Sequence, residues 1–97
     1  MGLPMIRLAV EFFGPAREIA GVAEVELDLV DGATVHEVLR ALVQTFPEFR
    51  DAVVDPADWT LRPYFLINLN GTATIKDPEA VPPAGSRLIL MSSVTGG

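Results

Sequence analysis

Hydrophobic and polar residues alternate near the start of the chain, and this alternation predicts two β-strands. The first runs over Met5–Phe13 and ends at Gly14-Pro15, because proline cannot donate to a strand ladder. The second covers Glu24–Leu29, with apolar residues on one face and only acidic residues on the other. We expect this second strand to lie at a sheet edge or to face water, and to pair with the first as an antiparallel hairpin. Residues 16–20 between them predict a short helical turn.

A spacing of three and four residues between apolar positions predicts one helix after the turn at Asp31-Gly32. Thr34 and Glu37 are spaced as a capping box, in which each side chain satisfies a free backbone N–H of the first turn. Pro47 ends the helix. The apolar stripe consists of Val35, Val38, Leu39, Leu42, Val43 and Phe46. We expect Leu39 and Leu42 to face the sheet and to form the core with Ile6, Leu8 and Leu88.

The segment Phe49–Pro63 predicts a connecting loop, with one helical turn near Arg50–Val54. Asp55 and Asp58 flank Pro56 in this segment, so we interpret them as solvated turn residues rather than paired catalytic carboxylates. Trp59, the only tryptophan, is expected at the margin of the core.

The last third of the chain predicts three more strands. Tyr64–Leu69 and Thr72–Ile75 flank Asn70-Gly71, a dipeptide typical of two-residue hairpin turns. Arg87–Val94 is apolar on both faces, and a run without alternation belongs in the middle of a sheet. We expect it to lie beside the first strand and parallel to it. The predicted fold class is therefore α+β, a β-grasp with a mixed sheet of about five strands packed on one main helix.

The composition of the chain narrows the classes of function. Its 97 residues, 49% of them hydrophobic, predict a single domain over residues 1–97. The net charge is −6 and the seven basic residues are scattered, so the pattern predicts no nucleic-acid partner. No signal peptide and no run long enough to cross a bilayer is recognised, so we expect no membrane partner and a cytoplasmic location.

Two residue types limit the chemistry that the side chains can perform. Cysteine is absent, which excludes disulfides, thiolate metal sites and a catalytic thiol. His36 is the only histidine, and a metal ligand or general base would need partners that the sequence does not offer. We expect His36 to be solvent-exposed and without a functional role, and we expect no bound metal.

The end of the chain is its most distinctive stretch. The last predicted strand runs into a tail, residues 92–97, that ends in Gly96-Gly97. Six extended residues could carry the terminal carboxylate roughly 20 Å from the domain. Glycine lacks Cβ, so such a tail fits a narrow channel in a partner protein. The alternative is a frayed chain end of no consequence.

Several motifs, in this order and spacing, make the chain resemble the sulfur-carrier family of ubiquitin-like proteins. This family includes the small subunit of molybdopterin synthase and the thiamin sulfur carrier. The motifs are Phe13–Gly21, Asp31–Val35 at the helix start, Phe46–Glu48 at its end, Ile67–Gly71, and the terminal Val94–Gly97. Two features depart from the molybdopterin synthase subunit. Ser92-Ser93 replaces an apolar pair before the tail, and Asp51–Pro63 is longer than in the shortest members, as in carriers serving cysteine or other sulfur metabolites.

The resemblance implies chemistry at the C-terminal carboxylate. A separate E1-like adenylating enzyme would use ATP to adenylate Gly97, while the carrier itself binds no cofactor. A sulfurtransferase or cysteine desulfurase would supply the sulfur that converts the adenylate to a thiocarboxylate. The sulfur would pass to an acceptor enzyme such as the molybdopterin synthase large subunit. Gly96, Thr95 and Val94 would form the part of the tail that enters the partner.

Other functions remain open on the sequence alone. The sulfur acceptor could belong to cysteine, thiamin or another sulfur metabolism. The same adenylate could be passed to a lysine of another protein, which would make the chain a ubiquitin-like modifier; Lys76 is its only lysine. The third alternative is a plain interaction module with an idle tail.

The predicted sheet has more apolar surface than one helix can cover. We therefore expect the face away from the helix to dock partners, with Phe13 and Met91 contributing. The alternative is that the Phe49–Pro63 loop covers this face.

Overall fold

The computed structural model describes residues 2–93. The expectations for Val94, Thr95, Gly96 and Gly97 therefore concern residues that lie outside the described part of the chain. Within it, all the strands and the main helix predicted from the sequence are present, with boundaries that differ by one or two residues.

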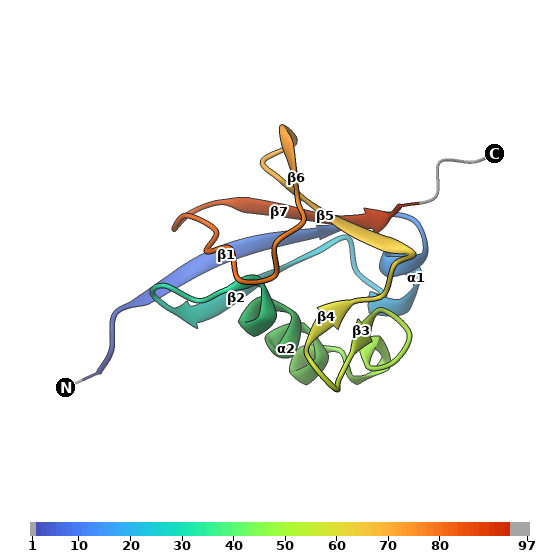
Figure 1. Ribbon diagram of the computed structural model, residues 1–97, viewed down its shortest axis with the longest axis horizontal. Coiled ribbons are helices and arrows are strands. Elements are labelled where there is room, and N and C mark those ends of the chain that lie inside the picture. Colours follow the sequence, from blue (N-terminus) through green and yellow to red (C-terminus); the bar gives the residue numbers. More distant parts are fainter. Residues whose placement is uncertain (1, 94–97) are drawn as a thin grey trace.

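A five-stranded mixed sheet forms one layer of the protein (Figure 1). Its strands, in spatial order, are β2 (Glu24–Val30), β1 (Met5–Phe12), β7 (Arg87–Ser92), β5 (Phe65–Leu69) and β6 (Ala73–Ile75). β1 pairs with β2 in antiparallel and with β7 in parallel orientation, and β5 pairs antiparallel with both β7 and β6. The predictions that β2 lies at an edge and β7 in the middle are confirmed. The architecture is the α+β β-grasp.

The hairpin turn between β5 and β6 follows its sequence signal. Asn70 and Gly71 have φ values of 54° and 76°, as a type I′ turn requires at both central positions. The Thr72 N–H donates to the Leu69 carbonyl oxygen over 3.0 Å and closes the turn.

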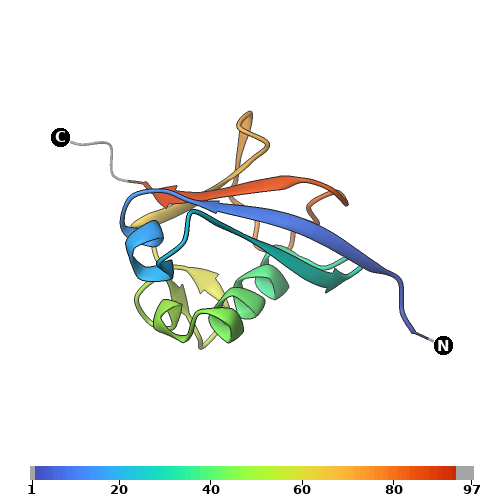
Figure 2. The ribbon, with the colours of Figure 1, turned by 180° about the vertical axis from the view of Figure 1, so that it is seen from behind.

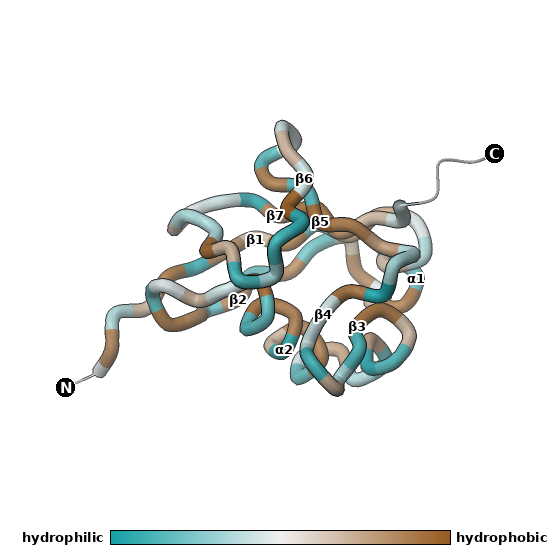
Figure 3. Tube along the Cα trace, in the orientation of Figure 1, coloured by the Kyte–Doolittle hydropathy of each residue, from teal (hydrophilic) through white to brown (hydrophobic). Residues whose placement is uncertain are grey.

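The main helix, α2 (Val35–Thr45), packs its apolar stripe against one face of the sheet. Its capping box is formed: the Glu37 N–H donates to the Thr34 hydroxyl over 3.4 Å, and the Thr34 N–H donates to the Glu37 carboxylate over 3.4 Å. Leu39 and Leu42 are buried against the sheet residues Leu8 and Leu88, as expected, whereas Ile6 is only partly buried. Figure 3 shows hydrophobic residues along the strands and the facing side of the helix, with hydrophilic residues in the turns.

A second, short helix joins the first two strands. α1 (Pro15–Ala20) begins with proline, which suits the first helical position because its missing N–H would have no partner there. It buries Ala16 completely and ends at Gly21, where φ is 76° and the N–H donates to the Arg17 carbonyl oxygen.

The segment Phe49–Pro63 was predicted as a connecting loop with one helical turn near Arg50–Val54. The Val53 N–H donates to the Phe49 carbonyl oxygen in such a turn, but the prediction missed a hairpin. A 3₁₀ turn, η1 (Pro47–Phe49), leads into a two-stranded hairpin made of β3 (Val54–Asp55) and β4 (Thr60–Leu61). Phe49, Val53 and Val54 are fully buried, so this segment is part of the core. Strands of two residues are too short to show an alternating pattern, which is why the sequence did not indicate them.

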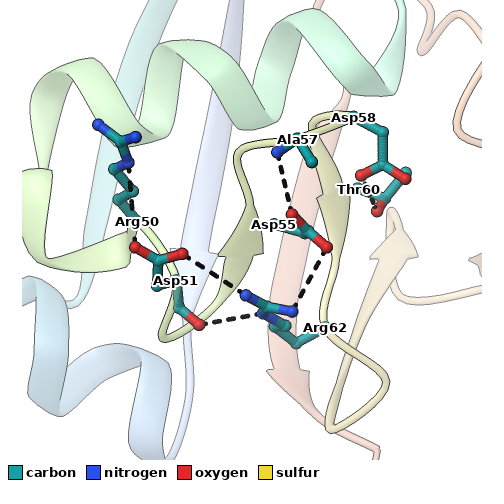
Figure 4. A network of polar contacts seen from close by, with 7 residues as sticks. All are labelled: Arg50, Asp51, Asp55, Ala57, Asp58, Thr60 and Arg62. Atoms are coloured by element: carbon teal, nitrogen blue, oxygen red, sulfur yellow. Dashed lines mark hydrogen bonds and ion pairs between the residues drawn. The ribbon is translucent and has the colours of Figure 1, made fainter.

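Polar contacts hold this hairpin together (Figure 4). The Arg62 guanidinium lies 3.6 Å from the Asp51 carboxylate and 3.4 Å from that of Asp55, and its Nε–H donates to the Asp51 carbonyl oxygen. Asp55 also accepts a bond from the Ala57 N–H, and Asp58 accepts one from the Thr60 hydroxyl. The two aspartates therefore support the turn, in agreement with the sequence interpretation.

His36 differs from its predicted exposed position. It is half-buried, and its Nδ1 lies 3.0 Å from the carbonyl oxygen of Trp59. Trp59 packs at the margin of the core, as expected, and the Arg40 guanidinium lies 5.8 Å from the centre of its ring. His36 thus links α2 to the hairpin, a contact that depends on two segments far apart in the sequence.

Candidate functional site

Among residues 2–93, no helix packs on one face of the sheet. Figures 1 and 2 show α2, β3 and β4 together on the same side, so the segment after α2 does not cover the opposite face. The burial of Phe49 and Val53 in the core is consistent with this arrangement. The alternative in which the Phe49–Pro63 loop shields the far face is therefore wrong, and we refer to that face as the open face.

Four apolar side chains meet at one end of the open face. Successive side chains of a strand point to opposite faces of the sheet, and the buried residues of β5 and β7 face α2. Their neighbours Leu66, Ile89 and Met91 therefore point away from α2. Leu66 pairs with Met91 across β5 and β7. Phe13 extends β1 by one residue, because its N–H donates to the Leu90 carbonyl oxygen over 3.0 Å. We call the set Phe13, Leu66, Ile89 and Met91 the apolar patch.

Exposure differs among the members of the apolar patch. The Phe13 side chain is 46% exposed, whereas Leu66, Ile89 and Met91 are each half-buried. An exposed aromatic ring beside partly exposed aliphatic residues forms an apolar surface of the kind that binds another protein. The structure thus brings together the two predicted partner-binding residues, Phe13 and Met91. Leu66 and Ile89 were not named from the sequence, because their place beside Met91 depends on the register of β5 and β7.

Two clusters of charged residues lie on the part of the open face formed by β1, β2 and the start of β7. The Arg7 guanidinium lies between Asp28, to which its Nε–H donates over 2.9 Å, and Glu26 at 3.2 Å. Arg87 pairs with Glu11 and with Glu24. The pKa of Arg7 is raised above the ordinary arginine value, mainly by its hydrogen bond to Asp28. The pKa of Arg87 is raised as well, mainly by its hydrogen bond to Glu24. All the pairs are exposed enough to contribute little to stability, so their main effect is to place charged clusters beside the apolar patch.

The apolar patch lies where the chain continues toward its terminal residues. β7 ends at Ser92, which pairs with Phe65. The Ser93 N–H donates to the Tyr64 carbonyl oxygen over 2.6 Å, and its hydroxyl donates to the Pro63 carbonyl oxygen over 2.7 Å. Ser92 and Ser93, which the sequence analysis placed in the tail, are therefore fixed to the sheet. The predicted reactive residue Gly97, with Gly96, Thr95 and Val94, lies beyond them and outside the described residues.

Other kinds of site receive no support from the described residues. Between residues 2 and 93, no cluster of three or more histidine, aspartate or glutamate side chains is arranged to hold a metal ion. In the same part of the chain, no helix is long and apolar enough to cross a membrane.

Comparison with known proteins identifies the family. The sequence model of the ThiS family matches residues 10–97, almost the whole chain. The protein belongs to the ThiS family. These are ubiquitin-like sulfur carriers of the type that the sequence motifs indicated. No curated protein sequence matches the chain as a relative.

Solved structures support the same fold for this ThiS-family protein. SAMP1 from Haloferax volcanii is 27% identical with a TM-score of 0.80, over 94% of this chain and 99% of that chain. The small archaeal modifier protein 1 from Methanosarcina acetivorans is 24% identical with a TM-score of 0.72, over 97% and 99% of the two chains. Urm1 from Trypanosoma brucei is 24% identical with a TM-score of 0.73, over 96% and 97%. The last two show the fold alone.

Proposed function

We propose that this ThiS-family protein carries sulfur as a thiocarboxylate on Gly97 and donates it in molybdopterin synthesis. The observation that carries the proposal is that the family match runs through the last residue and so includes the diglycine end. The apolar patch supports it, because a docking surface at the end of β7 would hold a partner close to the residue that reacts.

The chemistry follows from the poor reactivity of a carboxylate. Its negative charge repels nucleophiles and an oxide ion is a poor leaving group, so the Gly97 carboxylate must first be activated. Its oxygen attacks the α-phosphorus of ATP within an E1-like adenylating enzyme, which releases pyrophosphate and forms the acyl-adenylate. The terminal sulfur of a persulfide on the sulfur donor then attacks the acyl carbon and displaces AMP. A thiol reductant cleaves the resulting acyl disulfide, which leaves the thiocarboxylate on Gly97. Because this chain contains no cysteine, the sulfur comes from a sulfurtransferase or cysteine desulfurase.

Each part of the molecule has a separate role in this scheme. The apolar patch, centred on Phe13 and Met91, docks the adenylating enzyme and then the acceptor, such as the molybdopterin synthase large subunit. Val94, Thr95 and Gly96 carry Gly97 into the partner's active site. ATP is bound by the activating enzyme and not by the carrier. The reactions take place in the cytoplasm.

Intact mass spectrometry tests the proposal. The protein is incubated with ATP, its adenylating enzyme, a cysteine desulfurase, free cysteine as the sulfur source and a thiol reductant, and we expect one oxygen to be exchanged for sulfur. A variant lacking Gly97 is the matched control and should keep its mass unchanged. Transfer of that sulfur to a molybdopterin precursor, and not to thiamin or cysteine precursors, would establish the pathway. A wild-type mass that stays unchanged under these conditions would contradict the carrier function.

A second candidate is a protein modifier, favoured by the 27% identity to SAMP1 over nearly the whole chain. In this case a lysine amine of a target protein attacks the activated Gly97 and releases AMP, which forms an isopeptide bond. The same mass measurement in native cells separates the two functions, because a modifier appears as large covalent adducts. Chains of the protein on itself would use Lys76 as their only side-chain attachment point.

A further inference from the structure

A second surface lies at the β6 edge of the sheet and reaches Ser93, the residue that precedes the terminal Val94–Gly97. It is a groove of about 500 Å³, and its floor includes Val35 and Leu39 of α2 and Phe65 of β5. β4 forms one wall through Leu61, and the chain leaving β6 forms the other through Lys76. We infer that this groove binds an extended, acidic segment of a partner protein.

The strand edge beside the groove is incompletely paired. β6 ends at Ile75, which pairs with Ile67, so Phe65 and Leu66 have no partner strand on that side. The Tyr64 carbonyl oxygen and the Asn70 N–H form hydrogen bonds with β7 and the residue after it. Backbone groups alternate in direction along a strand, so those of the odd-numbered residues of β5 point toward β6. The Phe65 N–H donates to the Arg62 carbonyl oxygen. The Phe65 carbonyl oxygen faces the edge that β6 leaves uncovered, where an N–H of an added extended segment would pair with it.

The charges of the groove differ from those of the chain as a whole. The protein has a net charge of −6, yet the residues lining the groove include Arg62 and Lys76 and no aspartate or glutamate. Arg62 is already engaged by Asp51 and Asp55. Lys76 is exposed and takes part in none of the ion pairs found among residues 2–93. An apolar floor with an unengaged ammonium group at its rim is complementary to apolar residues followed by a carboxylate.

The partner of this groove is another protein rather than the chain's own end or a second copy. Only four residues follow Ser93, and the proposed function delivers these four to an enzyme's active site, so they cannot fill the groove during activation. Two copies of a chain with net charge −6 repel each other. Leu66 is the one residue that lines both the groove and the apolar patch.

The test is an NMR titration of the full chain with two synthetic peptides, acetyl-Thr-Val-Thr-Val-Asp-Asp-amide and its Lys-Lys counterpart. We expect the aspartate peptide to shift the amide resonances of Leu61, Phe65 and Lys76 saturably, and to bind at least about threefold more tightly than the lysine peptide. Lys76→Glu should invert this preference. Arg17→Glu changes the net charge by the same amount at an exposed site outside the groove, so it should leave the preference unchanged.

Four results would overturn the inference. One is the absence of saturable shifts with the aspartate peptide up to about 5 mM, a concentration at which even weak binding of roughly millimolar Kd is detected. Another is equal affinity for the two peptides. A third is a change in the resonances of Leu61 and Lys76 when only Gly96 and Gly97 are deleted, which keeps the new carboxylate away from Ser93 of the groove and would make the chain's own end the occupant. The fourth is a dependence of those resonances on protein concentration without peptide, which would indicate a second copy.

Discussion

The packing of α2 on the sheet gives a quantitative prediction for Leu42→Ala. The Leu42 side chain is 0% exposed and lies on the face of α2 that contacts the sheet. The substitution removes three carbon atoms from the core, and their transfer from water contributes roughly 2–2.5 kcal/mol at about 0.8 kcal/mol for each. The fully buried neighbours Val38 and Leu8 cannot fill the space without leaving their own contacts, so part of the cavity remains. We therefore expect a loss of about 3–5 kcal/mol in the free energy of unfolding.

Urea denaturation followed by circular dichroism measures this loss. For a small domain with a urea dependence of about 1–3 kcal/mol per molar, the midpoint should fall by more than about 1 M. Leu3→Ala is the matched control, because the same atoms are removed from a side chain that is 70% exposed. It should change the stability by less than about 0.5 kcal/mol. Equal midpoints for the two variants would show that the face of α2 directed at the sheet has been assigned wrongly.

Three further predictions concern docking, activation and the start of the helix. Phe13→Asp should weaken binding to the adenylating enzyme at least about tenfold in a calorimetric titration, with an unchanged unfolding midpoint, and undiminished binding would remove the apolar patch as the docking surface. Deleting Gly97 should abolish ATP–pyrophosphate exchange by displacing the reacting carbon, and Gly96→Val should do so by crowding the partner's channel; exchange at the wild-type rate without Gly97 would refute the carrier function. Thr34→Ala should lower the stability by about 1 kcal/mol in urea denaturation through loss of the capping box with Glu37, and an unchanged stability would mean that the cap contributes nothing.

The functional surface was only partly predictable from the sequence. Phe13 and Met91 were indicated because the strands starting at Tyr64 and Arg87 are apolar on both faces while only one helix is available to cover the sheet. Leu66 and Ile89 joined them only when the register was known, since Leu66 pairs with Met91 through contacts between segments some 25 residues apart. The groove at the β6 edge left no signal in the sequence, because it arises where β6 is shorter than β5.

The sequence by itself determined the elements whose information is local. The apolar stripe of α2, the capping box at Thr34 and the alternation in β1 each depend only on residues within one segment. β7 is apolar on both faces, and such a strand is stable only between two other strands. Tertiary structure decided what depends on distant partners. The β3–β4 hairpin has strands of two residues and is held by Arg62 and by the burial of Phe49, Val53 and Val54, none of which a local period reveals. The half-buried position of His36 likewise depends on the Trp59 carbonyl oxygen, 23 residues away, because a hydrogen bond across that distance exists only once the core has packed.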